Sequence, residues 1–324
     1  MRSCRPTLAL LGAAAVLTAC AGTATSVSST TLPAARSAHG KSWILPAAKS
    51  TSLLYISNAG TSDVTIYTYL DGNGLVLVGQ LTGFSFPAGM CADGAGNVWV
   101  PDYDTRKILE FAHGATAPIF TISERSGHPY DCAIDSNTGN IAIANQQPGN
   151  RHSLDGNVTV YAKGSHRGRS YQPANGFGEV DFLAYDDKSN LFVDGTEHDR
   201  SPGLFKLAKG ANELTPMTLS GGTLNVPGAI NWIKPTLMVG DGDFENKGAP
   251  GAYKLFVSGS TATVVGSLTF TGTQQTYAFS RRADRVIVPD HLKSVVRIYA
   301  LSDGTLVNQF GTEVSLPFGA VVSQ

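Results

Sequence analysis

Pro317-Phe318-Gly319-Ala320-Val321-Val322 is the last copy of a phrase that recurs along this sequence. The phrase consists of a proline, one or two further residues, a glycine and an apolar strand. In earlier copies the strand runs on into a hairpin, whereas the chain ends at Gln324, soon after the last copy. We therefore expect the last copy to complete a repeat that begins incomplete at Leu53 to Ile56. Two chain ends that share one sheet predict a closed ring of repeats.

Tight hairpin turns mark the repeats further inward. Asp93 to Asn97, Asp135 to Asn140 and Asp186 to Asn190 align with one another, and each is followed by an apolar run. Gly and Asn tolerate the positive φ that such turns require. The turns begin 42 and 51 residues apart, which is the range of one propeller blade per repeat.

Strand patterns fill each repeat, and no window shows a sustained helical period. The 36 glycines and 16 prolines suit a chain that turns often. The sequence therefore predicts an all-β fold, a six-bladed β-propeller over residues 51–324 with the C-terminal strand closing blade one. A β-sandwich is the alternative, although sandwiches rarely repeat in regular units of four strands. The expected inner strands are Pro87 to Ala92, Pro129 to Ile134, Gly178 to Tyr185, Pro227 to Trp232, Thr276 to Ser280 and Pro317 to Val322. The expected outer strands include Val76 to Leu81, Pro118 to Ile122, Met217 to Leu219, Val264 to Phe270 and Leu306 to Phe310.

The first 19 residues are typical of an export signal. Arg2 and Arg5 precede an apolar stretch from Leu8 to Leu17, which is too short for a permanent membrane span. Leu17-Thr18-Ala19-Cys20 resembles the lipobox of bacterial lipoproteins, which implies that Cys20 becomes lipidated and starts the mature chain. An ordinary secretory signal with an incidental cysteine is the alternative.

Residues 20–50 are rich in Ala, Ser and Thr and are predicted to form a flexible tether. The predicted location is the bacterial cell envelope, with the membrane as a partner through the lipid anchor. Ala21 after the lipidated cysteine favours the outer membrane by analogy with enteric lipoproteins.

The charge balance disfavours nucleic acid as a partner. The whole chain has 24 basic and 25 acidic residues, and the first 19 residues hold two of the basic ones. No basic stripe or nucleic-acid motif stands out in the sequence. We expect a monomer without nucleic acid.

Two cysteines remain after Cys4 and Cys20 are set aside. Cys91 and Cys132 fall in the inner strands of neighbouring repeats, four and three residues after the prolines of their phrases. Their side chains should point to opposite faces of their sheets, and opposite faces of adjacent blades confront each other. A disulfide between blades two and three is expected. Two buried thiols, or thiols that serve a metal or catalysis, are the alternatives.

An Asp or Asn recurs after the second strand of each repeat. It forms either a ring of carboxylates or a set of caps for the turns that follow these strands. The members of this set are Asn58, Asp102, Asn145, Asp194, Asp241 and Asp290.

Four polar residues break the repeat and are the candidate channel ligands. Asp131, Glu179 and Asp181 lie at the start of inner strands or within them, and His128 directly precedes one. Side chains there can reach the central channel, where ligands bind by default in this architecture. The alternative is that these groups hold water or a structural cation.

The phrases Pro87-Ala88-Gly89, Gly96 to Asp102 and Ile108 to Phe111 resemble those of the NHL-repeat superfamily. The resemblance is good in blade two and loose over about five blades. It implies a binding scaffold, or else a lyase or lactonase that works with channel histidines or a metal set.

No metal-binding histidine spacing and no nucleophile motif is found in the sequence. We therefore expect a scaffold for a protein, peptide or glycan. The alternative is a lyase or lactonase with a divalent cation, calcium or zinc, near Asp131, Glu179 and Asp181.

Overall fold

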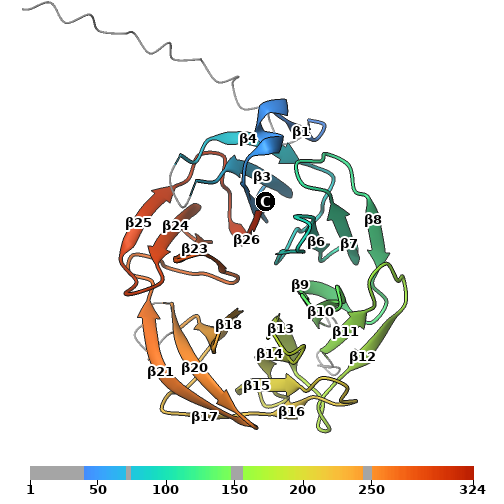
Figure 1. The fold of residues 1–324 in the computed structure, drawn as a ribbon, viewed down its shortest axis with the longest axis vertical. Helices are drawn as coiled ribbons and strands as arrows, with labels where there is room; N and C mark the ends of the chain where they lie inside the picture. The colour runs from blue at the N-terminus through green and yellow to red at the C-terminus, as the bar shows by residue number, and fades with distance from the viewer. Residues whose placement is uncertain (1–39, 71–73, 147–155, 244–249) are drawn as a thin grey trace, which may run out of the picture. The chain divides into compact units, whose positions relative to one another are not determined.

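Six small sheets stand around a central axis (Figure 1). This computed structural model describes residues 40–70, 74–146, 156–243 and 250–324. Each sheet has four or five strands and is one blade, so the predicted six-bladed β-propeller is confirmed. The described residues also contain one short 3-10 helix, η1 (Pro46–Ser50).

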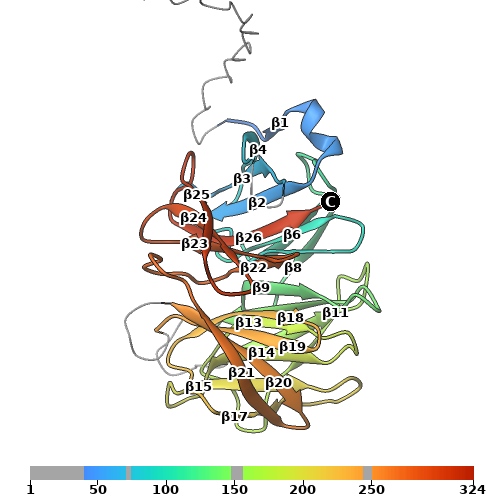
Figure 2. The ribbon, with the colours of Figure 1, turned by 60° about the vertical axis from the view of Figure 1, so that its left-hand side comes forward.

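Blade one joins the two ends of the described chain. Its order from the axis outward is β26, β2, β3, β4, β1. Tyr55 pairs with Val321 in an antiparallel ladder, and Figure 2 shows the blue strand β2 beside the red strand β26. The predicted closure by the C-terminal strand is therefore confirmed. The bounds are β26 (Pro317–Ser323), β2 (Leu53–Asn58), β3 (Asp63–Thr68), β4 (Leu77–Leu81) and β1 (Trp43–Ile44).

Part of the segment assigned to the tether belongs to the propeller. Trp43 pairs with Gln80 at the outer edge of blade one, and Ala48 of η1 is buried. Ile44 and Leu45 pack against the core between blades one and two. The apolar run Trp43-Ile44-Leu45 is too short to predict from sequence alone that this segment joins the propeller, so the predicted tether extends too far. Residues 1–39, including Cys20, lie outside the described residues.

Blades two, three and four follow the predicted order of four antiparallel strands, with the inner strand first along the chain. In blade two only Cys91 and Ala92 form a regular inner ladder, and an isolated bridge joins Pro87 to Asp102. The strands are β5 (Cys91–Ala92), β6 (Val98–Asp102), β7 (Lys107–Phe111) and β8 (Phe120–Ser123), then β9 (His128–Ile134), β10 (Ile141–Gln146), β11 (Asn157–Tyr161) and β12 (Gly168–Tyr171), then β13 (Glu179–Tyr185), β14 (Leu191–Thr196), β15 (Pro202–Leu207) and β16 (Thr215–Pro216).

Two strand predictions for blades four to six were wrong in detail. Blade four ends at Pro216, and Thr218 pairs in parallel with Thr261 of blade five. The inner strand of blade six begins at Ser280 rather than Thr276. Sequence periodicity does not show which neighbouring edge a short strand joins. The strands are β17 (Thr218–Ser220), β18 (Pro227–Ile233), β19 (Thr236–Asp241), β20 (Gly251–Ser258) and β21 (Thr261–Thr269), then β22 (Ser280–Arg282), β23 (Arg285–Asp290), β24 (Val295–Ala300) and β25 (Leu306–Phe310).

The core lies between the blades. Both faces of the second strands are buried, so Leu54 packs with Ile287 of blade six, whereas Tyr55 packs with Val98 of blade two. Alternating side chains of one strand thus enter two different interfaces. Packing therefore fixes the angle between successive blades and closes the ring.

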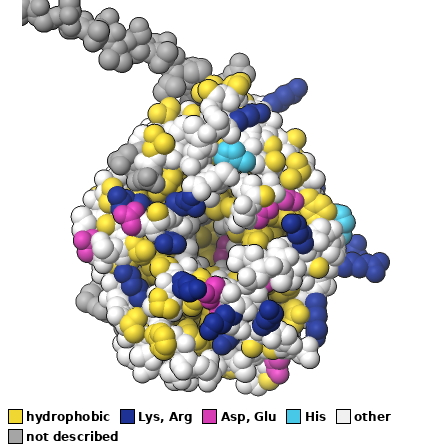
Figure 3. Space-filling view, in the orientation of Figure 1, with side chains coloured by type: hydrophobic (Ala, Val, Ile, Leu, Met, Phe, Trp, Pro, Cys, Tyr) yellow, Lys and Arg dark blue, Asp and Glu magenta, His cyan; other side chains and the backbone are white. Residues whose placement is uncertain are grey.

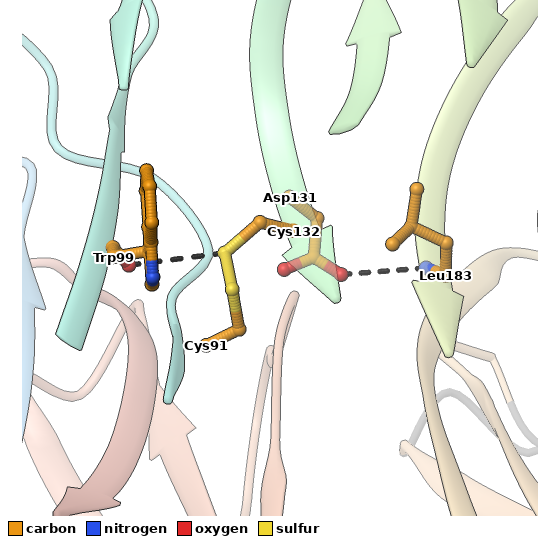
Figure 4. Close-up of a disulfide and its surroundings, with 5 residues drawn as sticks. All are labelled: Cys91, Trp99, Asp131, Cys132 and Leu183. Atoms are coloured by element: carbon orange, nitrogen blue, oxygen red, sulfur yellow. Dashed lines mark hydrogen bonds between the residues drawn. A yellow bond between two sulfur atoms is a disulfide. The ribbon is translucent and has the colours of Figure 1, made fainter. Parts of the chain in front are cut away.

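A disulfide joins blades two and three near the axis. Cys91 of β5 and Cys132 of β9 are bonded, with their Cα atoms 5.6 Å apart. Figure 4 shows the bridge beside Trp99, with the Asp131 carboxylate on the far side of β9. The predicted pairing is confirmed.

Removal of this bridge should destabilise the protein. The cysteines are 41 residues apart, so C91A/C132A should lower the free energy of unfolding by about 3 to 4 kcal/mol through the gained freedom of the unfolded chain. Urea unfolding of the variant and the parent would measure this loss. Peptide mass spectrometry after alkylation without reductant is the control, and alkylated Cys91 and Cys132 in the parent would contradict the assignment.

Candidate functional site

Hydrogen bonds near the axis cross every one of the six seams between blades. Main-chain pairs join three seams, and a polar side chain serves each of the other three. Because they surround the axis, these bonds hold the start of each inner segment at a fixed distance from the channel. The bonds are Gly319 N–H to Ser57 Oγ with Ser57 O–H to Ala88 O (2.8 and 2.7 Å), Gly89 N–H to Tyr130 O (2.9 Å), Leu183 N–H to Asp131 Oδ2 (3.3 Å), Gly228 N–H to Asp194 Oδ2 (3.1 Å), Ala229 N–H to Tyr277 O (3.2 Å) and Ala278 N–H to Phe318 O (3.3 Å).

Asp131 is one of these seam residues. Its side chain is buried, it accepts a hydrogen bond from Leu183 of blade four, and it lies against Gly89 of blade two. A Cβ atom on Gly89 would come within 2.2 Å of Asp131 Oδ1, so this glycine of the recurring phrase makes room for the carboxyl group. Burial raises the pKa of Asp131 to about 8. The structure therefore gives Asp131 a place between three blades, below the surface of the channel.

Four of the six recurring Asp or Asn residues accept hydrogen bonds from the segment that leads into the inner strand of their own blade. Asp102 accepts hydrogen bonds from the backbone N–H groups of Ser85 and Phe86. Asp241 receives those of Asn225 and Val226 in the same way. These bonds hold the segment before the inner strand, which the capping interpretation did not foresee. The expected cap of the turn after the second strand is present at Asp241, which also accepts from Asp243 N–H at 3.0 Å. Asp290 accepts from Gln274 and Gln275, and Asn58 from Ser315.

Aromatic rings interlock across the axis at the end of the ring where the inner strands begin, which we term the mouth. Phe318 is 1% exposed and lies 5.8 Å from Phe86, 4.9 Å from Tyr130 and 5.0 Å from Tyr277, measured between ring centroids. Tyr130 in turn contacts Phe182. Rings from five blades thus form an aromatic plug in the channel.

His128 lies at the rim of the mouth and is held in one tautomer. Arg106 donates to its Nε2 from Nε (3.0 Å) and from Nη2 (2.8 Å). Since Nε2 must accept, Nδ1 carries the proton and donates to the Tyr103 carbonyl (2.9 Å). Burial and then the Arg106 charge lower the pKa of His128. This imidazole is therefore neutral at pH 7.

Asp181 and Glu179 start β13 on the other side of the mouth. Gln146 donates to Asp181 Oδ1 at 2.5 Å, and burial raises the pKa of Asp181 to about 7. Glu179 is exposed. Burial and then the Glu179 charge raise the pKa of the Tyr103 hydroxyl. The mouth therefore combines half-buried aromatic rings with carboxylates.

Three of the four predicted ligand residues thus share the mouth, namely His128, Glu179 and Asp181. Tyr130, Phe318 and Tyr277 were not among the site residues predicted from the sequence. A signal for them exists, because Tyr130 and Phe318 directly follow the prolines of their inner-strand phrases. Both rings lie in the plug, with their centroids 4.9 Å apart.

The described part of the chain lacks two features that the sequence left open. Within residues 40–70, 74–146, 156–243 and 250–324, no group of three or more His, Cys, Asp or Glu side chains is placed to hold a metal ion. None of the helices in these ranges has the length and apolar character to span a bilayer.

Comparisons with known proteins support the fold. No family model matches this chain, and no curated protein matches its sequence. The structure is similar to a chain in the crystal structure of a nidogen/laminin complex, with a TM-score of 0.66 and 14% identity over 84% of this chain and 98% of that chain. The fold is a six-bladed β-propeller. At this identity the likeness extends to the fold alone.

Because of Asp131, the stability of the propeller against unfolding should fall as the pH rises. An unfolded Asp titrates near pH 4, whereas the folded pKa is about 8, so the folded state binds the extra proton between these values. This stabilising contribution is complete below about pH 4 and is lost as the pH rises through 8. Since Asn stays neutral, D131N should show a smaller fall in melting temperature between pH 6 and 9 than the parent. D199N, at an exposed site, is the control, and parallel curves for D131N and the parent would refute the assignment.

Proposed function

We propose that this protein is an exported, lipid-anchored binding scaffold whose mouth binds a protein or a peptide. The observation that carries the proposal is the set of partly exposed rings around the plug, Phe86, Tyr103, Tyr130 and Tyr277, next to the exposed carboxylate of Glu179. Aromatic side chains supply much of the binding energy at protein interfaces, since they bury a large area at little entropic cost.

Electrostatics at the mouth favour a ligand with a cationic group. Burial is the main cause that raises the pKa of Tyr103, and the negative charges of Glu179, Asp104 and Asp181 are the next largest causes. A lysine or arginine side chain would meet both this negative potential and the faces of the rings. Of the protein, peptide or glycan ligands expected from the sequence, this chemistry favours the first two.

The fold is compatible with such a role. The structurally similar chain belongs to a nidogen/laminin complex, and a propeller presents a broad face built of loops on a rigid ring.

The lipid anchor depends on Cys20. C20S should lose incorporation of an alkyne-tagged fatty acid and should move from the membrane fraction to the soluble fraction, because acylation supplies the membrane affinity. Labelling in the native host with detection by in-gel fluorescence measures this. C4S, which alters the predicted signal, is the matched control, and continued labelling of C20S would refute the anchor.

Glu179 should be needed for capture of the partner. Cross-linking in native membranes, followed by purification and mass spectrometry, should give a partner with the parent chain and lose it with E179K, because the charge reversal opposes a cationic group. E213K reverses an equally exposed charge in the loop after β15, at the other end of blade four, and should keep the partner. Equal capture by both variants would count against the mouth as the binding site.

A further inference from the structure

Two neighbouring grooves open on the face of the ring opposite the mouth, which we term the turn face. This face carries the hairpin turns after the inner strands, and the C-terminus lies on it (Figure 1). The first groove, of about 450 Å³, lies between blades two and three, and the second, of about 360 Å³, lies between blades three and four. Both are lined by Asp135 and Thr138. They therefore flank a single hairpin turn and together cross blade three.

Each groove has a lysine at the same position of its blade. Lys163 lines the first groove and Lys209 the second, and both side chains are exposed. Each lysine lies between an alanine and a glycine with positive φ, 72° for Gly164 and 78° for Gly210. These loops are repeated structures, so the two ammonium groups recur with the period of the blades.

The loops that carry the lysines are tied to the hairpin turns beside them. The backbone N–H of Lys163 donates to Asn140 Oδ1 at 3.3 Å, and that of Lys209 donates to Asn190 Oδ1 at 3.1 Å. These bonds fix the backbone of both loops in the same way before any ligand arrives, which limits the loop ordering that binding must supply.

Aromatic rings form part of the groove walls. Phe120 lines the first groove and is stacked by His166 with ring centroids 4.4 Å apart. Tyr171 and Tyr185 line the second groove, and the guanidinium of Arg169 lies 5.0 Å from the centroid of Tyr171. Aromatic walls of this kind suit a ligand that contains flat or ring-shaped groups. A surface that offered charge alone would not select for such groups.

The exposed charge around the grooves is mainly positive. Arg167, Arg169 and Lys188 add to the two lysines and are exposed, and Figure 3 shows Lys and Arg side chains spread over this face. Of the nearby acids, Asp135 and Asp186 are buried and Asp93, in the first groove, is partly buried, and all three accept hydrogen bonds within their own turns. The exposed Asp187 pairs with Lys234 at 2.8 Å, and the exposed Glu213 follows Asn212 of the second groove. Glu110, also in the first groove, accepts from Asn97.

We propose that the two grooves bind an acidic polysaccharide that runs across blade three, with its carboxylates at Lys163 and Lys209 and its sugar rings against the aromatic walls. A polymer with an acid on each sugar repeats its charge along the chain, as the lysines repeat from blade to blade. This site is independent of the mouth and of the partner proposed for it.

The test uses the unit from Arg36 to Gln324, which holds every described sheet and its closed ring. The probe is a fluorescently labelled oligogalacturonide, and anisotropy gives its Kd at low and at moderate salt. We expect binding that weakens with salt, and a Kd raised about tenfold or more in K163S/K209S because charged hydrogen bonds are lost. K107S/K293S removes two exposed lysines from the mouth side and should leave the Kd unchanged.

Four outcomes would overturn the proposal, and the first three concern sugar ligands. These are no binding of the oligogalacturonide, an equal loss in both double variants, and equal affinity for an uncharged maltooligosaccharide of the same length. Tighter binding of single-stranded DNA than of the oligogalacturonide would replace the polysaccharide with a nucleic acid. Melting temperatures of both double variants check that the exposed substitutions leave the fold intact.

Discussion

The pairing of β26 with β2 is the constraint on which the rest of this structure depends. Residues at the start of β26 contribute to two seams. Gly319 donates to Ser57, which in turn donates to Ala88 of blade two, and Phe318 accepts from Ala278 of blade six. The same Phe318 ring is the centre of the aromatic plug. A single segment therefore closes the ring, completes the hydrogen bonds around the axis and fills the channel.

This closure gives the propeller two chemically different ends. At the mouth the plug presents aromatic rings beside Glu179 and Asp181, and at the turn face two grooves present lysines on repeated loops. The plug lies within the channel and separates its two ends, so ligands at the mouth and at the turn face contact different residues. Repetition of the blades builds the turn face, whereas departures from the repeat, such as His128 and Glu179, build the mouth.

The candidate site was predictable in part. His128, Glu179 and Asp181 were found because they break the repeat, and they do gather at the mouth. Asp131 broke the repeat as well, but its carboxyl group lies in a seam against Gly89 and Leu183. Whether an inner-strand side chain faces the channel or the next blade depends on the angle between blades, and no local pattern in the sequence encodes that angle.

The sequence by itself determined the number of blades and the strand that closes the ring, and it favoured the pairing of Cys91 with Cys132. These follow from local repetition, turn chemistry and the two-residue alternation of strands, all of which act over short stretches of chain. Only the tertiary structure decided that residues 43–50 join blade one, that β17 pairs with blade five, and which polar groups meet at the mouth. Such contacts join segments far apart in the chain, and the packing between blades selects them.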